Sequence, residues 1–585
     1  MKRLPTIGLV IGLLPAALGC TGDAGNVSGS GGQQAGSGGS GSGSGGAGTG
    51  SGGSGTGSGG DSGASGSGGS QVITVACQSA ALGSPVLRLL TRGELQNSLS
   101  DAFPEVKGQW NASLPSNNVT DLGFDNDQSA TVGAQLAGSI LDTAKNVATA
   151  VTGNALANLL PCASSAGDRK CAETFLAKYG QRLFRRPLTT AEHDKYLTFF
   201  DASKTKSDFK TALKWMTVAL IQSPATLYRS EIGADKGDGT RALSAYEMAS
   251  ELSYMYTGTA PTDALLTSAG SGDLGDTTAL AKTLIKTDAG KQMLQRFFEL
   301  YLDYANVTSM AKGNIQNFGQ VSGDMVQETH AFIDDVLFQK SGGMKELLTA
   351  NTTNPSKALA AYYATGNAYS GGFPMPSNDY ASVTRPANLG IGILAQGAFL
   401  ATHASSTTSS PTKRGLFPYR KLFCQPKISP PPNVPALDTT APVTNVNTTR
   451  DRYELQHQLV MGATGSCASC HKRFDPMGFG FEHFDEGGRY RAKEGNFDIN
   501  SAASAAAPDG STMSFTDQES LMNALAGQPV VHECAAAYLA TYAFGTTEAC
   551  LGSSQVADLR AGKIGLVEAF AKLASEPHFT KRASQ

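Results

Sequence analysis

The sequence predicts a mainly α-helical body, built from several modules that irregular loops connect. Apolar residues recur at helical spacing along most of the chain after Val72, and few segments alternate as strands do. Two capping boxes, at Thr189 with Glu192 and Ser244 with Glu247, mark helix starts, because each places Glu three residues after an N-cap hydroxyl. Further helices are expected over Asp168–Arg185, Ser207–Gln222, Thr278–Tyr304, Gly323–Gln339 and Pro529–Ala543.

Residues 1–20 have the form of a secretory signal peptide. Met1-Lys2-Arg3 supplies positive charge, and an apolar stretch too short to span a bilayer follows. Ala17-Leu18-Gly19-Cys20 resembles the lipobox of bacterial lipoproteins, which implies lipidation of Cys20. Leu18 lies two places before the cysteine and not the usual three, so an ordinary cleaved signal stays an alternative. On either interpretation the mature chain is exported, and Thr21 after the cysteine favours an outer-membrane lipoprotein facing the periplasm or the cell surface.

Residues 21–71 are expected to form a flexible tether, because they are mostly Gly, Ser, Ala and Thr and cannot bury a core. With a lipid at Cys20, such a tether would hold the folded body off the membrane. It indicates location and not activity. Only 16% of residues are charged and the formal net charge is −3, with basic residues scattered, so no nucleic-acid partner is expected.

The most specific chemical signal is Cys467-Ala468-Ser469-Cys470-His471, the CxxCH attachment motif of a c-type haem. Two thiols three positions apart can each add across a haem vinyl group, and the adjacent imidazole can ligate the iron. We therefore expect one covalent haem c, held by Cys467, Cys470 and His471, in a cytochrome-c-like helical region near the C-terminus.

Other uses of Cys467 and Cys470 stay open at this stage. A zinc site would need a second Cys/His pair of similar spacing, which the sequence lacks. A thioredoxin-like redox pair would need a βαβ context, which the flanking segments do not show. A disulfide between the two cysteines is the main alternative to haem.

Export places the other cysteines in an oxidising compartment. With Cys20 assigned to lipid and two cysteines to haem, six remain, and an even number there is typical of three disulfides. Cys162 with Cys171 and Cys534 with Cys550 would each close a short loop. Cys77 with Cys424 then follows by elimination, and buried free thiols are the alternative.

Several short motifs, in order along the chain, resemble those of a family of exported proteins common in planctomycetes and myxobacteria. The motifs are Arg88–Asn97, Phe184–Thr189, Ser223–Arg229 with Tyr246–Tyr254, Ser410–Gly415 with Cys467–Arg491, and Pro508–Gly510 with Tyr542–Gly545. In that family they belong to domain-of-unknown-function modules 1587, 1595, 1592, 1588 and 1585. The resemblance covers nearly all of residues 87–579 and is weak over 307–386. It implies haem-dependent redox chemistry at the cell envelope, without an established reaction.

The resemblance divides the body into five helical modules. In the order of those numbers, they are expected to cover residues 72–160, 161–235, 236–385, 386–495 and 496–585. The proline-rich run Ile428–Pro435 is expected to be extended and to mark a boundary.

Residues after the motif suit the surroundings of a haem. Asp475-Pro476 would end the helix that carries His471, and Gly478 and Gly480 would let the backbone approach a flat cofactor. Four phenylalanines could wall a haem or simply form a core: Phe474, Phe479, Phe481 and Phe484. Arg489 and Arg491 could pair with haem propionates, and Asp485 and Glu486 are alternative partners.

Met513 is the predicted sixth iron ligand. It stands in a Gly-Ser-Thr-Met loop, at a distance from His471 in sequence like that in small mono-haem cytochromes. Further candidates are Met522, Met477, His403, His483 and His532.

These observations together predict an exported c-type haem protein that transfers electrons with an unidentified redox partner in the envelope. One alternative is a non-catalytic surface or polysaccharide-associated binding protein, in which Cys467 and Cys470 form a disulfide. Another is a haem enzyme with an open iron site.

Overall fold

The computed structural model describes residues 82–164, 168–365, 372–386, 388–428, 446–461, 466–547 and 551–584, with only the backbone given for 456–461, 466, 467 and 469. All described residues belong to one compact unit. The predicted signal peptide with Cys20, the tether, and most of the proline-rich run lie outside the described residues. No helix within the described ranges is both long and apolar enough to cross a membrane.

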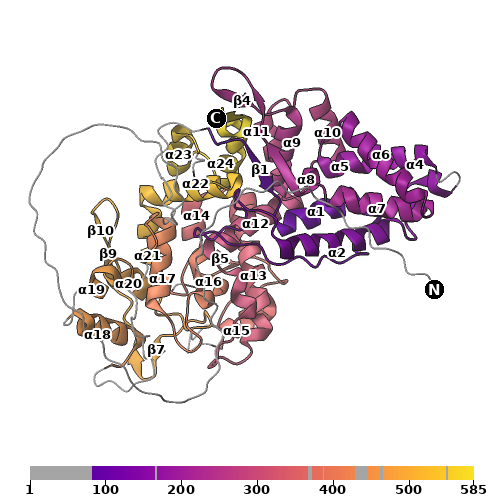
Figure 1. Ribbon diagram of the computed structural model, residues 1–585. Coiled ribbons are helices and arrows are strands. Elements are labelled where there is room, and N and C mark those ends of the chain that lie inside the picture. Colours follow the sequence, from indigo (N-terminus) through magenta and orange to yellow (C-terminus); the bar gives the residue numbers. More distant parts are fainter. Residues whose placement is uncertain are drawn as a thin grey trace, which may run out of the picture. The chain divides into compact units, whose positions relative to one another are not determined.

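The first half of the body is helical, as predicted (Figure 1). Its helices are α1 Arg92–Ala102, α2 Ala134–Val151, α3 Leu156–Leu159, α4 Arg169–Phe175, α5 Gln181–Phe184, α6 Thr190–Lys204, α7 Phe209–Ile221 and α8 Pro224–Leu227. The capping box is confirmed: the Thr189 hydroxyl accepts from the Glu192 amide, and the Glu192 carboxylate accepts from the Thr189 amide. The predicted helix over 168–185 runs from α4 to α5 through a π-helical turn and ends at Arg185, whose φ is 58°.

The middle of the chain is also helical, with one break that the sequence did not reveal. Its helices are α9 Ala245–Thr257, α10 Asp263–Gly270, α11 Thr277–Ile285, α12 Asp288–Leu302, α13 Phe318–Asp334, α14 Met344–Thr349 and α15 Lys357–Tyr363. The helix predicted over 278–304 is two helices, α11 and α12. The Thr287 hydroxyl caps α12 by accepting from the amide of Gly290, where a Cβ would overlap the backbone of α11.

The C-terminal part combines short helices with small hairpins. Its helices are α16 Gly397–Thr402, α17 Pro411–Phe417, α18 Thr449–Met461, α19 Ser466–His471, α20 Asp475–Phe479, α21 Gln518–Ala526, α22 Pro529–Phe544, α23 Ser553–Arg560, α24 Leu566–Lys572 and α25 Pro577–Thr580. The hairpins are β7 Lys493–Glu494 with β8 Phe497–Asp498, and β9 Ala503–Ala506 with β10 Thr512–Phe515. The fold is therefore mainly α, as predicted.

Other short antiparallel strands join distant segments. β1 Val86–Leu89 pairs with β2 Tyr228–Glu231, and β5 Thr352–Thr353 pairs with β6 Val383–Thr384. A three-stranded sheet has β4 Thr240–Ala242 between β3 Ala234–Asp235 and β11 Lys581–Ala583. The described C-terminal end thus returns to the middle of the chain, beside β4 (Figure 1).

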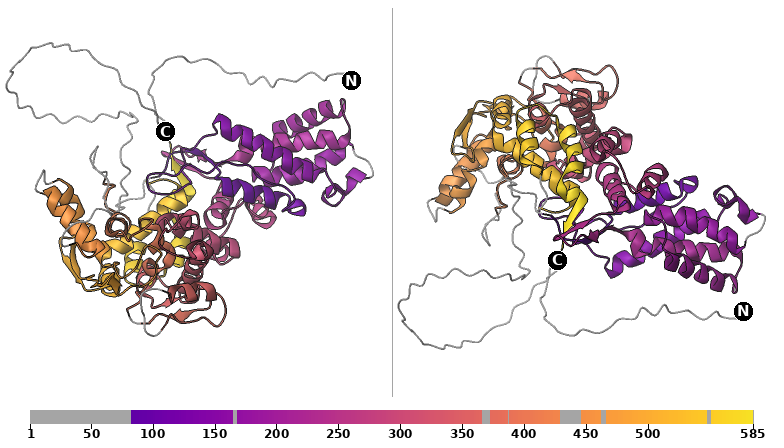
Figure 2. Two further views of the ribbon diagram at one scale, coloured as in Figure 1. Left: turned by 90° about the horizontal axis from the view of Figure 1, so that it is seen from below. Right: turned by 90° about the horizontal axis from the view of Figure 1, so that it is seen from above.

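Two hydrophobic clusters form the core, and their sequence ranges overlap. One gathers residues between Leu89 and Ala260 from the first helices, and the other gathers residues from Leu122 to Phe579. Figure 2 shows the indigo-to-magenta helices on one side and the coral-to-yellow elements on the other in both views. α9 contributes to both clusters, through Tyr254 in the first and Tyr256 in the second.

Two disulfides are present among the described cysteines. Cys162–Cys171 is confirmed, but Cys424 pairs with Cys534 across 110 residues of sequence. The expected pairs Cys534–Cys550 and Cys77–Cys424 are therefore wrong, because α22 packs against the turn Pro418–Leu422, which leads directly to Cys424. Cys77 and Cys550 lie outside the described residues.

A group of buried charges joins the start, middle and end of the body. In Arg229 of β2, Nε lies 3.3 Å from Oε1 of Glu231, and Nη2 lies 3.6 Å from Oε2 of Glu251 in α9. Nη2 of Arg582 in β11 lies 2.6 Å from Oε2 of Glu231. Arg88 of β1 lies 4.0 Å from Glu231 and also donates to the Ala543 carbonyl. Glu231 is therefore the carboxylate that three buried arginines share.

Candidate haem site

The CxxCH motif lies on the short helix α19, Ser466–His471. Helical positions three apart lie on one face, so the backbone places positions 467 and 470 together. Cys470 is a half-buried free thiol, whereas the side chain of Cys467 is outside the description. The motif helix already ends at His471, and Asp475 and Pro476 form the first turn of the next helix, α20, so these two residues do not end the motif helix as predicted.

The imidazole of His471 is held by a buried carboxylate. Its Nδ1 lies 3.2 Å from Oδ2 of Asp475, a residue that is only 1% exposed. Asp475 also accepts a hydrogen bond of 2.8 Å from the Thr412 hydroxyl of α17. A carboxylate at one ring nitrogen is typical of metal-ligating histidines, because it fixes the ring and directs the other nitrogen toward the metal.

Asp475 is a candidate functional residue that was expected from the sequence only to help end a helix. Its position four residues after His471 was the available signal, since that spacing brings two side chains onto one face of a helical segment. Phe474 adds an aromatic contact, with its ring centroid 5.1 Å from that of His471.

Met513 lies in a strand and not in the loop that the sequence suggested. It belongs to β10, opposite Ala505 of β9, and is 4% exposed within the larger hydrophobic cluster. The tight turn at Gly510 makes this possible, because its φ of 84° reverses the chain before Met513. The hairpin packs on α20, the helix that follows the motif. Met477 and Met522 are fully buried in the same cluster.

The three candidate histidines bond to backbone carbonyls. Nδ1 of His403 lies 3.0 Å from the Phe399 oxygen, and burial lowers its pKa to about 4. Nδ1 of His483 lies 3.0 Å from the Arg491 oxygen, and Nε2 of His532 lies 3.1 Å from the Ala526 oxygen. In the described geometry each has a structural hydrogen bond of its own.

The four phenylalanines that could wall a haem or form a core are all buried. Phe481 packs against Phe399, and Phe484 packs against Tyr490. Phe479 lies under the guanidinium of Arg450, and Phe474 has a ring contact with His471.

The glycines and arginines after the motif also have structural partners. A Cβ at Gly478 would overlap the backbone of Pro411, and one at Gly480 would crowd Leu521 and Phe515, so both serve close packing. Arg489 pairs with Asp485 at 2.8 Å, the alternative partner that the sequence offered. Arg491 pairs instead with two acids, at 3.4 Å and 3.5 Å: Glu482 and Glu494.

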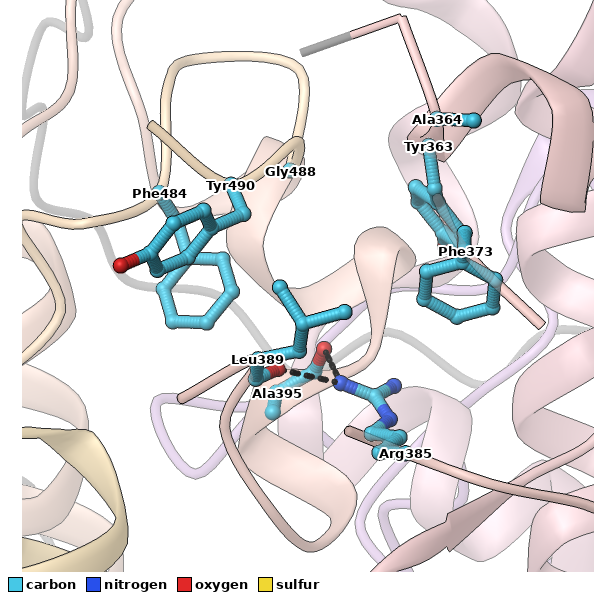
Figure 3. A pocket seen from close by; sticks show the side chains of 9 residues that line it. All are labelled: Tyr363, Ala364, Phe373, Arg385, Leu389, Ala395, Phe484, Gly488 and Tyr490. Carbon is cyan, nitrogen blue, oxygen red and sulfur yellow. Dashed lines mark hydrogen bonds between the residues drawn. The ribbon is translucent and has the colours of Figure 1, made fainter. Parts of the chain in front are cut away.

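A pocket near Phe484 is too small for a cofactor. Figure 3 shows Tyr363, Phe373 and Tyr490 around it, with Arg385 below donating to the Leu389 and Ala395 carbonyls. Its volume of about 20 Å³ accommodates one water molecule. In the part of the chain that the structure describes, no group of three or more His, Cys, Asp or Glu side chains could hold a metal ion.

Fold and site together define a mainly α-helical, multi-module protein with a thiol–imidazole motif beside a buried carboxylate. Four family models match it in the predicted order, each described as a protein of unknown function: PSD3 (DUF1587) over 88–153, PSD5 (DUF1595) over 171–231, PSD4 (DUF1592) over 243–364 and PSCyt3 (DUF1588) over 391–494. The matches confirm these four modules, and the fifth, module 1585 over 496–585, stays a prediction. No curated protein and no solved structure matches the chain.

Proposed function

We propose that the protein is an exported, lipid-anchored c-type haem protein that carries electrons at the cell envelope. The observation that carries the proposal is the hydrogen bond between His471 and the buried Asp475, next to the free thiol of Cys470. A chance CxxCH would not need a buried carboxylate at Nδ1, whereas a ligating histidine uses one. The donor set of two thiols and one oriented imidazole fits haem c.

Each residue has a distinct part in this proposal. Cys467 and Cys470 would attach the cofactor and His471 would hold it, while Asp475 keeps the imidazole ring and its tautomer fixed. The hydroxyl of Thr412, a residue of α17, donates a hydrogen bond to Asp475. The imidazole is therefore connected to a second helix through this carboxylate. A bound haem would supply one-electron redox chemistry.

The sixth ligand separates an electron carrier from an enzyme. We expect Met513→Ala to abolish any weak sulfur-to-iron band of the ferric protein, to lower the reduction potential, and to let carbon monoxide bind the reduced form, because a saturated iron binds no added ligand. Visible spectra with and without carbon monoxide provide the measurement, with Met325→Ala, at a buried methionine of α13, as the control.

Carbon monoxide binding by the unchanged protein would contradict the carrier and favour a haem enzyme with an open site. If Met513→Ala changes nothing while a variant of His403 or His483 does, the protein remains a carrier and Met513 is not the ligand.

The lipid anchor is proposed from Cys20 and the Gly/Ser-rich residues that follow it. Labelled fatty acid should enter the exported chain, and Cys20→Ser should lose the label and leave the membrane fraction, because the anchor is the only hydrophobic attachment proposed. A Cys20→Ser chain that stays on the membrane would rule out lipidation as the anchor.

A further inference from the structure

A cleft of about 610 Å³ lies where three of the matched modules meet, and none of its lining residues belongs to the haem motif. One wall is the segment Leu114–Asp125 of the first module. Another is the end of α12 with the following residues to Asn306, and the third is formed by Arg420 and Lys421. The Cys424–Cys534 disulfide ties this third wall to α22.

The acids and cations of the cleft are unequally paired. Arg296 takes two carboxylates, Asp125 at 2.9 Å and Glu299 at 2.8 Å. Asp121 pairs with Lys427 at 3.3 Å, outside the cleft lining. Of the four acids that line the cleft, two thus share Arg296 and a third pairs with Lys427.

Two arginines have no such partner. Nε of Arg92 and Nε of Arg420 are buried and make no hydrogen bond to the described protein. Among the described side chains no carboxylate forms an ion pair with Arg92, and burial lowers its pKa. Nη2 of Arg420 has only a long contact of 3.5 Å with the Asp121 carbonyl. A buried Nε–H donor is costly to leave unpaired, and an anion bound at either guanidinium would give these half-buried arginines the partner they lack.

Lys421 lies on the same wall as Arg420. Its Nζ donates to the Leu122 carbonyl and lies 4.6 Å from the ring centroid of Tyr538. Burial, and then the charge of Arg420, lower its pKa to about 7, while Asp303 acts in the opposite direction. Burial raises the pKa of Asp303, the fourth acid of the lining, and the charge of Lys421 opposes that rise.

We propose that this cleft binds a small ligand through an oxyanion group, either carboxylate or phosphate, held by Arg92 and Arg420. The planar guanidinium matches both groups with paired hydrogen bonds, which an ammonium cannot do. The site is independent of the haem and goes beyond electron transfer. It would give the three modules a common ligand.

Calorimetric titration of the purified full chain tests the site with glucuronate, inorganic phosphate and neutral glucose. We expect at least one of the two anions to bind and glucose not to bind, and the anion that binds more tightly identifies the group. Arg92→Gln and Arg420→Gln should each weaken binding by about tenfold or more. Lys195→Gln makes the same charge change on exposed α6 and should leave the affinity unchanged.

Arg92→Lys keeps the charge but not the planar fork, so it should bind between the unchanged protein and Arg92→Gln while preserving the fold. Binding of neither anion, equal binding of glucose, or unchanged affinity in the folded arginine variants would overturn the proposal.

Discussion

Replacing Glu231 by alanine is expected to destabilise the folded body by about 3–5 kcal/mol, because it leaves buried arginines without their shared carboxylate. Glu231 is 3% exposed and lies within 4.0 Å of Arg88, Arg229 and Arg582. Burial alone would raise the pKa of Glu231, but these guanidiniums lower it below the usual carboxyl range. The midpoint of urea unfolding measures the effect.

Glu173→Ala is the matched control, since Glu173 makes only an exposed pair with Arg169, and its loss should change stability by no more than about 0.5 kcal/mol. An unchanged urea midpoint for Glu231→Ala would show that Glu231 does not stabilise the fold.

The neighbouring Glu251 also makes the stability of the fold depend on pH, in the direction opposite to that of Glu231, because its pKa is raised and not lowered. Burial raises the pKa of Glu251, and the adjacent Glu231 adds to this, so the folded state holds a proton that the unfolded chain releases. Its contribution to stability is therefore present at low pH and falls as the pH rises through the raised pKa. Glu251→Gln should remove that fall.

Removing the Cys424–Cys534 disulfide is expected to cost about 5 kcal/mol, more than removing Cys162–Cys171, for which about 3 kcal/mol is expected. A crosslink stabilises by restricting the unfolded chain, and the restriction grows with the closed loop, here 110 residues against 9. Double Cys→Ser variants of each pair avoid unpaired thiols. Their urea midpoints should fall in that order.

Equal losses of stability, or a larger loss for the short loop, would contradict this account. The segment that the Cys424–Cys534 disulfide closes contains α18, α19 and α20. Loss of this disulfide should therefore also loosen the region of the haem motif.

The helices could be predicted from the sequence because their signals are local. Thr189 with Glu192 and Ser244 with Glu247 are capping boxes in the structure as in the sequence, and α22 covers the residues expected of it. The break between α11 and α12 was missed because Gly290 marks a close approach of two helices, which only tertiary packing reveals.

The surroundings of the candidate site were harder to predict, since they depend on contacts between distant segments. Cys534 lies near Cys550 in sequence but bonds to Cys424 in space. In the sequence, Phe481 and Phe484 were equally compatible with a haem wall and a core. In the structure they pack in the hydrophobic core, against Phe399 and Tyr490 respectively. The contact of Asp475 with His471 was within reach of helical spacing, but its burial against Thr412 was not.

The central claim is covalent haem at Cys467, Cys470 and His471, and haem content tests it most directly. The full chain, exported from cells that have the c-type haem maturation machinery, should give a c-type pyridine haemochrome at about one haem per chain. The haem should resist acid–acetone extraction and be lost from a Cys467→Ser, Cys470→Ser chain. A purified unchanged chain without covalent haem, whose two cysteines titrate as free thiols or as a disulfide, would contradict the claim.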